Sequence, residues 1–572
     1  MPDRSVRARL RRVSAVVLAA ALAAGLGACQ AVPGTGPVQE GLARLDQGEK
    51  QLEFNPGLPI EGADQEAIVR GFIRAATSSA NDYEIAREFL APGYASEWDP
   101  DEQVFVDEGT QSYRSTGDQS GELLVSGLAT VDRAGTLTPL PTGQGSGETV
   151  MSFQFERVAG EWRISYAPNG VILDKINFPL VWTYRSLYFL TPDNRLVAET
   201  RWYLNRETLR TRIVGGLLGG PSDADAAALR SAFPAGTSLA SDTVPVNDGV
   251  AHIEFSAELL EGDADTLELV HAQVAASLQS VQGVTGFEIA VNGNVVDAGQ
   301  VETPDTHVRS SENLVTTLVR GGELGTLVGG EIEPLPKLGE RILALRPDAV
   351  ALGENRTSAA VLHPDPDGGS AVSWVSANDL VTIDTRSGLA EPGLDRFGYV
   401  WSYASSDRNE IIVRRPSEDA ERLKLPALTD RAPVAVRVSP GGNRLALLVA
   451  GDGGTSEVYS VAIVRDAASR PVGLGGVAAL EMVVSGTPVD LDWVDEMRLV
   501  MLSRASAVTK VTLGPLGQLS IDTGTVSHAV AVSGGGTRSL IRVLDAEGRL
   551  YGPQGSGWQW QSDDVRLIVR SG

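Results

Sequence analysis

The chain has 572 residues, a formal net charge of −25 and one cysteine. Its length predicts about three or four domains, and the lone cysteine excludes an intramolecular disulfide. Because nucleic acids and anionic lipid surfaces repel an acidic protein, the charge argues against both as binding surfaces, and no nucleic-acid partner is expected.

Residues 1–28 have the layout of an export signal. Five arginines precede an apolar run at residues 13–26. This run is shorter than the roughly 20 residues that a helix needs to span a bilayer, and a basic start before a short apolar stretch is typical of a secretory signal. The pair Arg11 and Arg12 leaves both the general and the twin-arginine export routes open.

The lone cysteine directly follows this signal. Leu26, Gly27, Ala28 and Cys29 resemble a bacterial lipobox, in which a signal peptidase cuts before a lipid-modified cysteine. The resemblance implies that Cys29 becomes the first mature residue and carries fatty acids such as palmitate, which anchor the protein at the extracytoplasmic face of the cell membrane. Two or more acyl chains anchor a protein stably, at about 0.8 kcal/mol per buried CH₂. A buried, inert thiol in a secreted chain is the alternative.

The residues after Cys29 predict a tether. Loss of residues 1–28 removes five arginines and one aspartate and leaves a net charge near −29, so we expect the folded body to stay off the membrane surface. Residues 29–60 are rich in proline and glycine and poor in large apolar groups, which predicts a flexible segment. No other apolar run reaches 18 residues, so no further membrane span is expected.

Residues 61–178 predict an α+β domain. The stretch "DQEAIVRGFIRAATSS" has helical apolar spacing, and "NDYEIAREFL" adds a second short helix. Strand patterns follow in "GELLVSGLATVDR", "TVMSFQFERV" and "EWRISYA". The order resembles an NTF2-like cone, with the helices on one face of a curved sheet. Two interpretations stay open, a ligand pocket inside the cone or a core filled by Phe153, Phe155 and Trp162.

Residues 179–300 predict a second α+β domain. A hairpin turns at Pro192, Asp193 and Asn194, and helical and strand segments follow to "GFEIAVNG". The order resembles a GerMN domain, and the motif residues that carry the resemblance are Pro234, Gly236, Thr237, Asp248, Gly249, Ala251, Phe255 and Ser256. The resemblance implies an extracytoplasmic setting but supplies no catalytic residue, so these positions are expected to be structural.

Residues 301–340 are predicted to form a linker, and residues 341–572 a β-propeller. A strand, polar turn and strand pattern recurs from Ala349, Val400, Ala435, Val489 and Ala529. The spacing averages about 45 residues, as expected for propeller blades, and "VRVSPGGNRLALLV" is similar to blades of TolB-like propellers. We expect five or six blades, with a pair of β-sandwiches as the alternative.

Motifs for catalysis or metal binding are missing from the sequence. The five histidines are far apart, and HExxH, GxSxG and phosphate-loop spacings do not occur. The acidic stretches "DPDEQVFVDEG" from residue 99 and "HPDPDGG" from residue 363 could ligate a divalent cation, but the second lacks EF-hand spacing, and solvated loops explain both. We therefore expect no metal, no cofactor and no catalytic residues.

The lipobox, cone, GerMN domain and propeller, in this order, resemble the LpqB lipoprotein family of actinobacteria. The resemblance implies a non-enzymatic accessory lipoprotein that binds the extracellular domain of the sensor histidine kinase of the Mtr two-component system and influences cell-wall homeostasis and division. The alternatives are an envelope enzyme, with a carboxylate pair in the propeller funnel, and a small-ligand sensor acting on cell-wall material.

Overall fold

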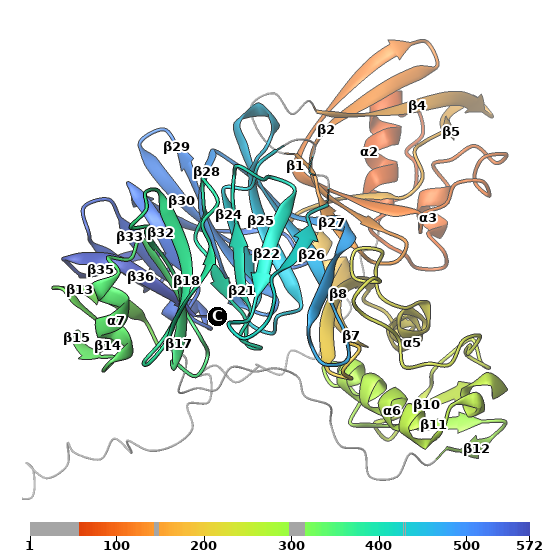
Figure 1. Cartoon of the computed structure of the whole chain (residues 1–572). Helices are drawn as coiled ribbons and strands as arrows, with labels where there is room; N and C mark the ends of the chain where they lie inside the picture. Colours follow the sequence, from red (N-terminus) through yellow and green to blue (C-terminus); the bar gives the residue numbers. More distant parts are fainter. Residues whose placement is uncertain (1–55, 142–147, 297–314, 427, 429–430, 572) are drawn as a thin grey trace, which may run out of the picture. The chain divides into compact units, whose positions relative to one another are not determined.

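The computed structural model describes residues 56–141, 148–296, 315–426, 428 and 431–571. Its first domain, here the N-terminal domain, has a short helical layer and a curved sheet (Figure 1). Helix α2 (Gln65–Ala75) begins at Asp64, whose carboxylate accepts a hydrogen bond from the Ala67 backbone. The short helix α3 (Glu84–Arg87) follows. The first helix therefore begins where the apolar spacing predicts it.

The sheet of the N-terminal domain has the order β5-β4-β2-β1-β6, and β3 pairs with β2. Its core lies between α2 and the sheet, where Phe72, Phe153 and Phe155 are buried. The strands are β1 (Gln103–Gly117), β2 (Ser120–Asp132), β3 (Leu137–Pro139), β4 (Thr149–Val158), β5 (Glu161–Tyr166) and β6 (Val171–Asp174).

The middle domain begins after the short helix α4 (Phe178–Val181) and contains two separate sheets. Strands β7 (Trp182–Leu190) and β8 (Leu196–Leu204) form an antiparallel hairpin. The second sheet has the order β12-β11-β10-β9, with β10 and β11 parallel. The remaining elements are α5 (Leu209–Gly219), β9 (Val246–Asn247), β10 (Val250–Phe255), the 3₁₀ turn Ala257–Glu261, α6 (Ala264–Leu278), β11 (Gly286–Val291) and β12 (Asn294–Val295).

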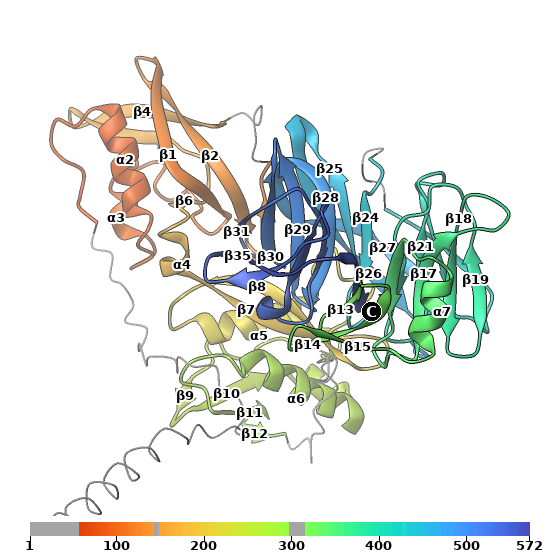
Figure 2. The same ribbon diagram turned by 90° about the vertical axis from the view of Figure 1, so that its left-hand side faces the viewer.

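The third domain is a β-propeller (Figure 2). Its described residues form six blades of four strands. The blades from β16 to β27 contain β16 (Ala349–Leu352), β17 (Ser358–Pro364), β18 (Ser370–Ser376), β19 (Leu380–Asp384), β20 (Gly393–Leu394), β21 (Val400–Tyr403), β22 (Glu410–Arg414), β23 (Glu421–Lys424), β24 (Ala435–Val438), β25 (Arg444–Ala450), β26 (Thr455–Arg465) and β27 (Pro471–Ser485). The next two contain β28 (Thr487–Asp495), β29 (Arg498–Ala505), β30 (Val508–Pro515), β31 (Ile521–Ser527), β32 (Ala529–Ser533), β33 (Arg542–Asp545), β34 (Leu550–Gln554) and β35 (Gly557–Ser562).

The sixth blade differs from the expected domain plan. It combines the last strand, β36 (Val565–Ser571), with β13 (Thr317–Arg320), β14 (Glu323–Val328) and β15 (Glu331–Pro334), followed by helix α7 (Leu338–Ala344). Residues 301–340 were expected to be a linker, so for residues 317–334 that expectation is corrected. These strands are short and separated by the glycine pairs at 321–322 and 329–330, which hides their apolar alternation. Strand β36 also pairs in parallel with β16, so the two ends of the propeller meet.

Candidate functional site

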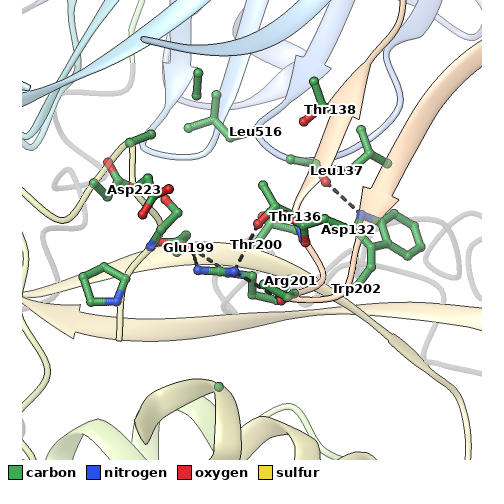
Figure 3. Close-up of a pocket in the computed structure, with 18 of the residues that line it drawn as sticks. Asp132, Thr136, Leu137, Thr138, Glu199, Thr200, Arg201, Trp202, Asp223 and Leu516 are labelled. Atoms are coloured by element: carbon green, nitrogen blue, oxygen red, sulfur yellow. Dashed lines mark hydrogen bonds and ion pairs between the residues drawn. The ribbon is translucent and has the colours of Figure 1, made fainter. Parts of the chain in front are cut away.

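A cavity of about 730 Å³ takes walls from all three domains, which belong to one unit spanning residues 52–572. We call it the junction cavity. Strand β8 supplies Glu199 to Leu204, the N-terminal domain supplies the turn before β3, and the propeller supplies β27 and the segment after β30 (Figure 3). A large cavity at a domain junction is the default place to look for a binding site.

Strand β8 carries charged side chains in a buried setting. The Arg201 guanidinium donates to a Glu199 carboxylate oxygen at 2.6 Å. It also donates to the Ala134 carbonyl at 3.2 Å and to the Thr136 hydroxyl at 3.0 Å, both in the N-terminal domain (Figure 3). A buried charge is tolerated only when it is paired and hydrogen-bonded, so Arg201 fixes the N-terminal domain against β8.

A second ion pair joins the middle domain to the propeller. Arg444, at the start of β25, donates to a carboxylate oxygen of Asp225 at 2.6 Å and to the Ala198 carbonyl at 3.0 Å. Arg444 is 5% exposed and Asp225 is 8% exposed. Burial alone would lower the Arg444 pKa, but the Asp225, Glu199 and Glu481 carboxylates outweigh burial and raise the pKa above its ordinary value. Arg444 therefore stays charged.

Two carboxyl groups of the junction cavity are harder to ionise than usual. Burial raises the pKa of Glu199, although Arg201 opposes the shift. Burial likewise raises the pKa of Glu481, on β27, which accepts hydrogen bonds from the Ser460 hydroxyl at 2.6 Å and from the Gly517 backbone at 3.1 Å. The cavity thus has more carboxyl groups than guanidinium groups in its buried wall, and this excess favours a proton or an added positive charge.

The tip of the β7–β8 hairpin also contacts the propeller. Asp193 accepts hydrogen bonds from Arg195 at 2.8 Å and from the Ser469 hydroxyl at 2.8 Å. Burial alone would raise the Asp193 pKa, but these bonds and one from Thr191 lower it to about 2. The Arg195 guanidinium lies 5.0 Å from the ring centre of Phe397, at a distance typical of a cation–π contact.

The cone of the N-terminal domain is filled by its own side chains. Its cavity, between Phe72, Phe105 and Phe153, is only about 20 Å³, which is enough for about one water molecule. Phe155 is buried, and its ring centre lies 6.4 Å from that of Trp162. Of the two interpretations of the cone, the structure favours a packed core.

The predicted anchor residues Leu26, Gly27, Ala28 and Cys29 lie outside the described residues. The predicted GerMN residues lie in turns and in the core of the middle domain. Thr237 donates to the Pro234 carbonyl at 2.8 Å, and Gly236 has φ +84°. Asp248 and Gly249 form the left-handed turn between β9 and β10.

The remaining GerMN residues join two segments of that domain. Phe255 is buried, with its ring centre 5.1 Å from that of Phe233, and Ala251 is buried on the same strand. The Ser256 hydroxyl accepts a hydrogen bond from the Ser238 backbone at 3.0 Å. These contacts suit structural residues, and the described side chains from 234 to 256 do not line the junction cavity.

The inner strands of the propeller carry a buried charge network. Arg437 on β24 donates to Asp490 at 2.9 Å and also binds Glu391. Arg570 on β36 donates to the other oxygen of Asp490 at 2.6 Å and also binds Glu391. The carboxylates Asp490 and Glu391 are therefore bound to arginine, whereas a glycosidase needs a carboxylate pair free to meet substrate.

The predicted acidic stretches do not assemble a metal centre. No group of three or more His, Cys, Asp and Glu side chains suited to hold a metal occurs within the described ranges. Asp367 donates its backbone N–H to the Asp365 carboxylate at 3.0 Å, as in a turn. His363 is buried and bonds Ser373 at 2.9 Å. Within the same ranges no helix is long and apolar enough to cross a membrane.

The charged residues of the junction cavity were not predicted from the sequence. The weak signal is the run "LVAETRWYL", where Glu199 and Arg201 interrupt an apolar strand. Their partners lie far along the chain, as in the pair Asp225 and Arg444, which are 219 positions apart. Such pairs can be identified only from the three-dimensional arrangement of the domains.

Three family models match successive parts of the chain. The model described as the N-terminal domain of lipoprotein LpqB matches residues 58–179. The model described as sporulation and spore germination matches residues 186–297. The model described as the lipoprotein LpqB beta-propeller domain matches residues 318–566, and so includes most of β13 and all of β14 and β15.

Curated relatives cover nearly the whole chain. A protein named lipoprotein LpqB from Streptomyces coelicolor is 28% identical, over 95% of this chain and 94% of the relative. A protein of the same name from Cutibacterium acnes is 23% identical, over 93% of this chain and 90% of the relative. Among solved structures, the first GerMN domain of the sporulation protein GerM from Bacillus subtilis is 22% identical, over 22% of this chain and 94% of that domain, with a TM-score of 0.18.

Proposed function

Because the chain belongs to the LpqB family of lipoproteins, we propose that it is a membrane-anchored accessory protein on the extracytoplasmic face. In this proposal it binds the extracellular domain of the sensor histidine kinase of the Mtr two-component system and modulates signalling in cell-envelope homeostasis and division. Cys29 holds the lipid anchor, and the proposal includes no catalytic step. A tether confines both partners to one membrane surface and raises their effective concentration, so a weak interface suffices.

The observation that carries the proposal is the joining of three domains by buried polar contacts. Arg201 binds the N-terminal domain, and Arg444 of the propeller binds Asp225 of the middle domain. Contacts of this kind hold surfaces of different domains in one arrangement, since breaking one leaves a buried charge unpaired. A protein that presents a composite surface to a partner needs such an arrangement.

The arrangement of acidic groups supports a role without catalysis. The propeller carboxylates Asp490 and Glu391 are both bound by Arg437 and Arg570. At the junction cavity, Glu199 is bound by Arg201, and Asp225 by Arg444. A general acid or base needs access to substrate within hydrogen-bond reach, and these groups already use their oxygens for internal contacts.

The second candidate function is the sensing of a small ligand. A ligand pocket inside the cone was one interpretation of the sequence, but the cavity volumes favour the junction cavity as its site. In the N-terminal domain, the cavity between Phe72, Phe105 and Phe153 holds about 20 Å³ and a groove beside α2 about 380 Å³, whereas the junction cavity holds about 730 Å³. Ligand pockets have volumes of roughly 300–1,000 Å³. A ligand there would contact all three domains and could adjust how they present their surfaces.

The test is direct binding. The full-length lipidated protein in lipid nanodiscs is immobilised, and the purified extracellular domain of the kinase is passed over it in a biolayer experiment. We expect saturable binding with a Kd in the micromolar range or tighter, absent from empty nanodiscs. The absence of binding at about 100 μM kinase domain, with a protein whose thermal unfolding shows it to be folded, would refute the proposal.

A further inference from the structure

Strand β1 of the N-terminal domain extends beyond its neighbour β6. The two strands pair in parallel only from Val104 with Val171 to Asp107 with Asp174. Strand β1 then continues to Gly117, paired on its other side with β2. Among the described residues, no strand pairs with the β6 side of β1 beyond Asp107. We call residues 109–117 the open edge of β1; the long β1–β2 hairpin that carries it is visible in Figure 2.

A turn stabilised by side-chain hydrogen bonds directly follows β6. The Asp174 carboxylate accepts hydrogen bonds from the backbones of Ile176 and Asn177 at 2.9 and 3.0 Å, and these bonds turn the chain away from β1. On β1 itself, the buried Asp107 carboxylate binds Gly109 and Gln111, both at 2.6 Å, across a break in the register. The unpaired part of β1 therefore begins at a β-bulge that the Asp107 side chain stabilises.

A groove of about 380 Å³ lies where β6 ends. One wall is α2, with Arg70, Ile73 and Arg74, and the other includes Gln111 of β1 and Leu173 of β6. Gln111 and Tyr113 lie on the same side of β1, and the Tyr113 hydroxyl binds Gln65 of α2 at 3.2 Å. The side of β1 that carries Gln111 and Tyr113 therefore faces α2.

Two arginines and one aspartate line this groove on a strongly acidic protein. Arg70 is paired with Glu66 at 2.8 Å, whereas Arg74 uses its Nε for the Arg70 carbonyl at 3.3 Å and is exposed. The Asp174 carboxylate, on the opposite wall, already accepts three hydrogen bonds. Next along the chain, Ile176 is 73% exposed and Leu180 is 45% exposed. The Arg74 side chain therefore shares the groove with Gln111, near the start of the open edge.

We propose that the open edge of β1 binds an extended segment of a partner protein, which adds to the sheet as a strand and places an acidic side chain against Arg74. Strand addition satisfies unpaired backbone groups, and pockets beside the edge select the side chains. The added strand continues along β1 from the point where β6 stops. The acidic residue is argued from charge complementarity with Arg74 in a chain of net charge −25.

The proposal rests on the proposed function, because the partner tested is the extracellular domain of the kinase. Proline is placed singly at residues 111 to 116 of the full-length lipidated protein in nanodiscs. Along an edge strand, backbone N–H groups point alternately to the neighbour and to the open side. We expect proline to weaken binding at least tenfold, with little change in Tm, at every second position, where the N–H points to the open side. At the positions between them the N–H points to β2, so proline removes a hydrogen bond to β2 and should lower Tm.

Arg74 supplies an independent readout with a matched control. Arg74→Glu should weaken binding at least tenfold, and Arg74→Lys should retain most of it. Arg538→Glu makes the same charge change at an exposed arginine of the propeller and should leave the Kd within twofold. Binding of all these variants with an unchanged Kd would overturn the site and leave the proposed function standing.

Two further outcomes would also overturn the proposed site on β1 or its partner. Absence of binding by the unaltered protein would overturn the proposed function and this site together. Self-association of the unaltered protein in analytical ultracentrifugation, lost in the same prolines that leave kinase binding intact, would assign the edge to a second copy of the chain and overturn the partner named here.

Discussion

The indole Nε1 of Trp202 donates a 2.8 Å hydrogen bond to the backbone carbonyl of Gly517, 315 positions away. The backbone N–H of the same tryptophan donates to the Gly135 carbonyl at 2.8 Å. One residue of β8 therefore bonds to the N-terminal domain and to the propeller. This bridge is a feature of the junction that substitutions can test.

Gly517 should be intolerant of a side chain. Its φ is +65°, and a Cβ there would lie 2.9 Å from the Cβ of Thr200. Gly555 has a similar φ of +58° with nothing within 4 Å of a built Cβ, so Gly555→Ala measures the backbone strain alone. We expect Gly517→Ala to destabilise by about 1–3 kcal/mol more than Gly555→Ala, the usual cost of overpacking. Equal losses in denaturant unfolding would show that the close approach does not matter.

Arg444→Met should destabilise the contact between the middle domain and the propeller. It leaves the Asp225 carboxylate buried without its 2.6 Å partner, and breaking a buried pair costs about 3–5 kcal/mol. The double variant Arg444→Met with Asp225→Leu removes both charges and should recover much of the loss. Thermal unfolding of the three proteins tests this, and a double variant no more stable than Arg444→Met would contradict it.

Glu481→Gln should stabilise the protein at pH 7. Burial raises the Glu481 pKa, so folding opposes ionisation of this group. The cost is absent below the unfolded-state pKa of about 4 and grows as the pH rises through the folded-state pKa. The variant should therefore unfold at a higher temperature than the wild type at pH 7, with the gap closing toward pH 4. A variant less stable by the same amount at both pH values would contradict this.

Asp193 should contribute stability that acid removes. Its folded pKa of about 2 lies below the unfolded value of about 3.9, which corresponds to at most about 2.6 kcal/mol. That contribution is present above pH 4 and is lost as the pH falls from about 4 to 2. Asp193→Asn should flatten this part of the stability profile, and Asp419→Asn, at an exposed aspartate, should leave it unchanged. Parallel profiles for the wild type and Asp193→Asn would refute the assignment.

Local signals in the sequence predicted elements whose pattern lies within a few turns or strands. The apolar spacing of Ile68 and Phe72 places α2, with both side chains in the core. The turn at Pro192 to Asn194 separates β7 from β8, with Asn194 at φ +61°. The blade repeats predict the propeller, because each repeat contains its own strands and turn.

Contacts between distant segments could not be predicted in the same way. Strand β13 pairs with β36, nearly 250 residues later, and its short segments at 317–334 were assigned to a linker. Glu199 and Arg201 looked like interruptions of a strand, and only the propeller and the N-terminal domain supply their surroundings. The pattern of residues in a single sequence does not indicate which surfaces of its domains contact one another.

We propose that the folded domains modulate a kinase from a lipid anchor at Cys29. The most direct measurement is kinase-dependent reporter output in cells that express the wild type, Cys29→Ala, or Cys29→Ala re-anchored by a transmembrane helix in place of residues 1–28. We predict that Cys29→Ala loses most of the modulation although the protein is folded and exported, and that the helix anchor restores it. Normal modulation by the released Cys29→Ala protein would contradict the account.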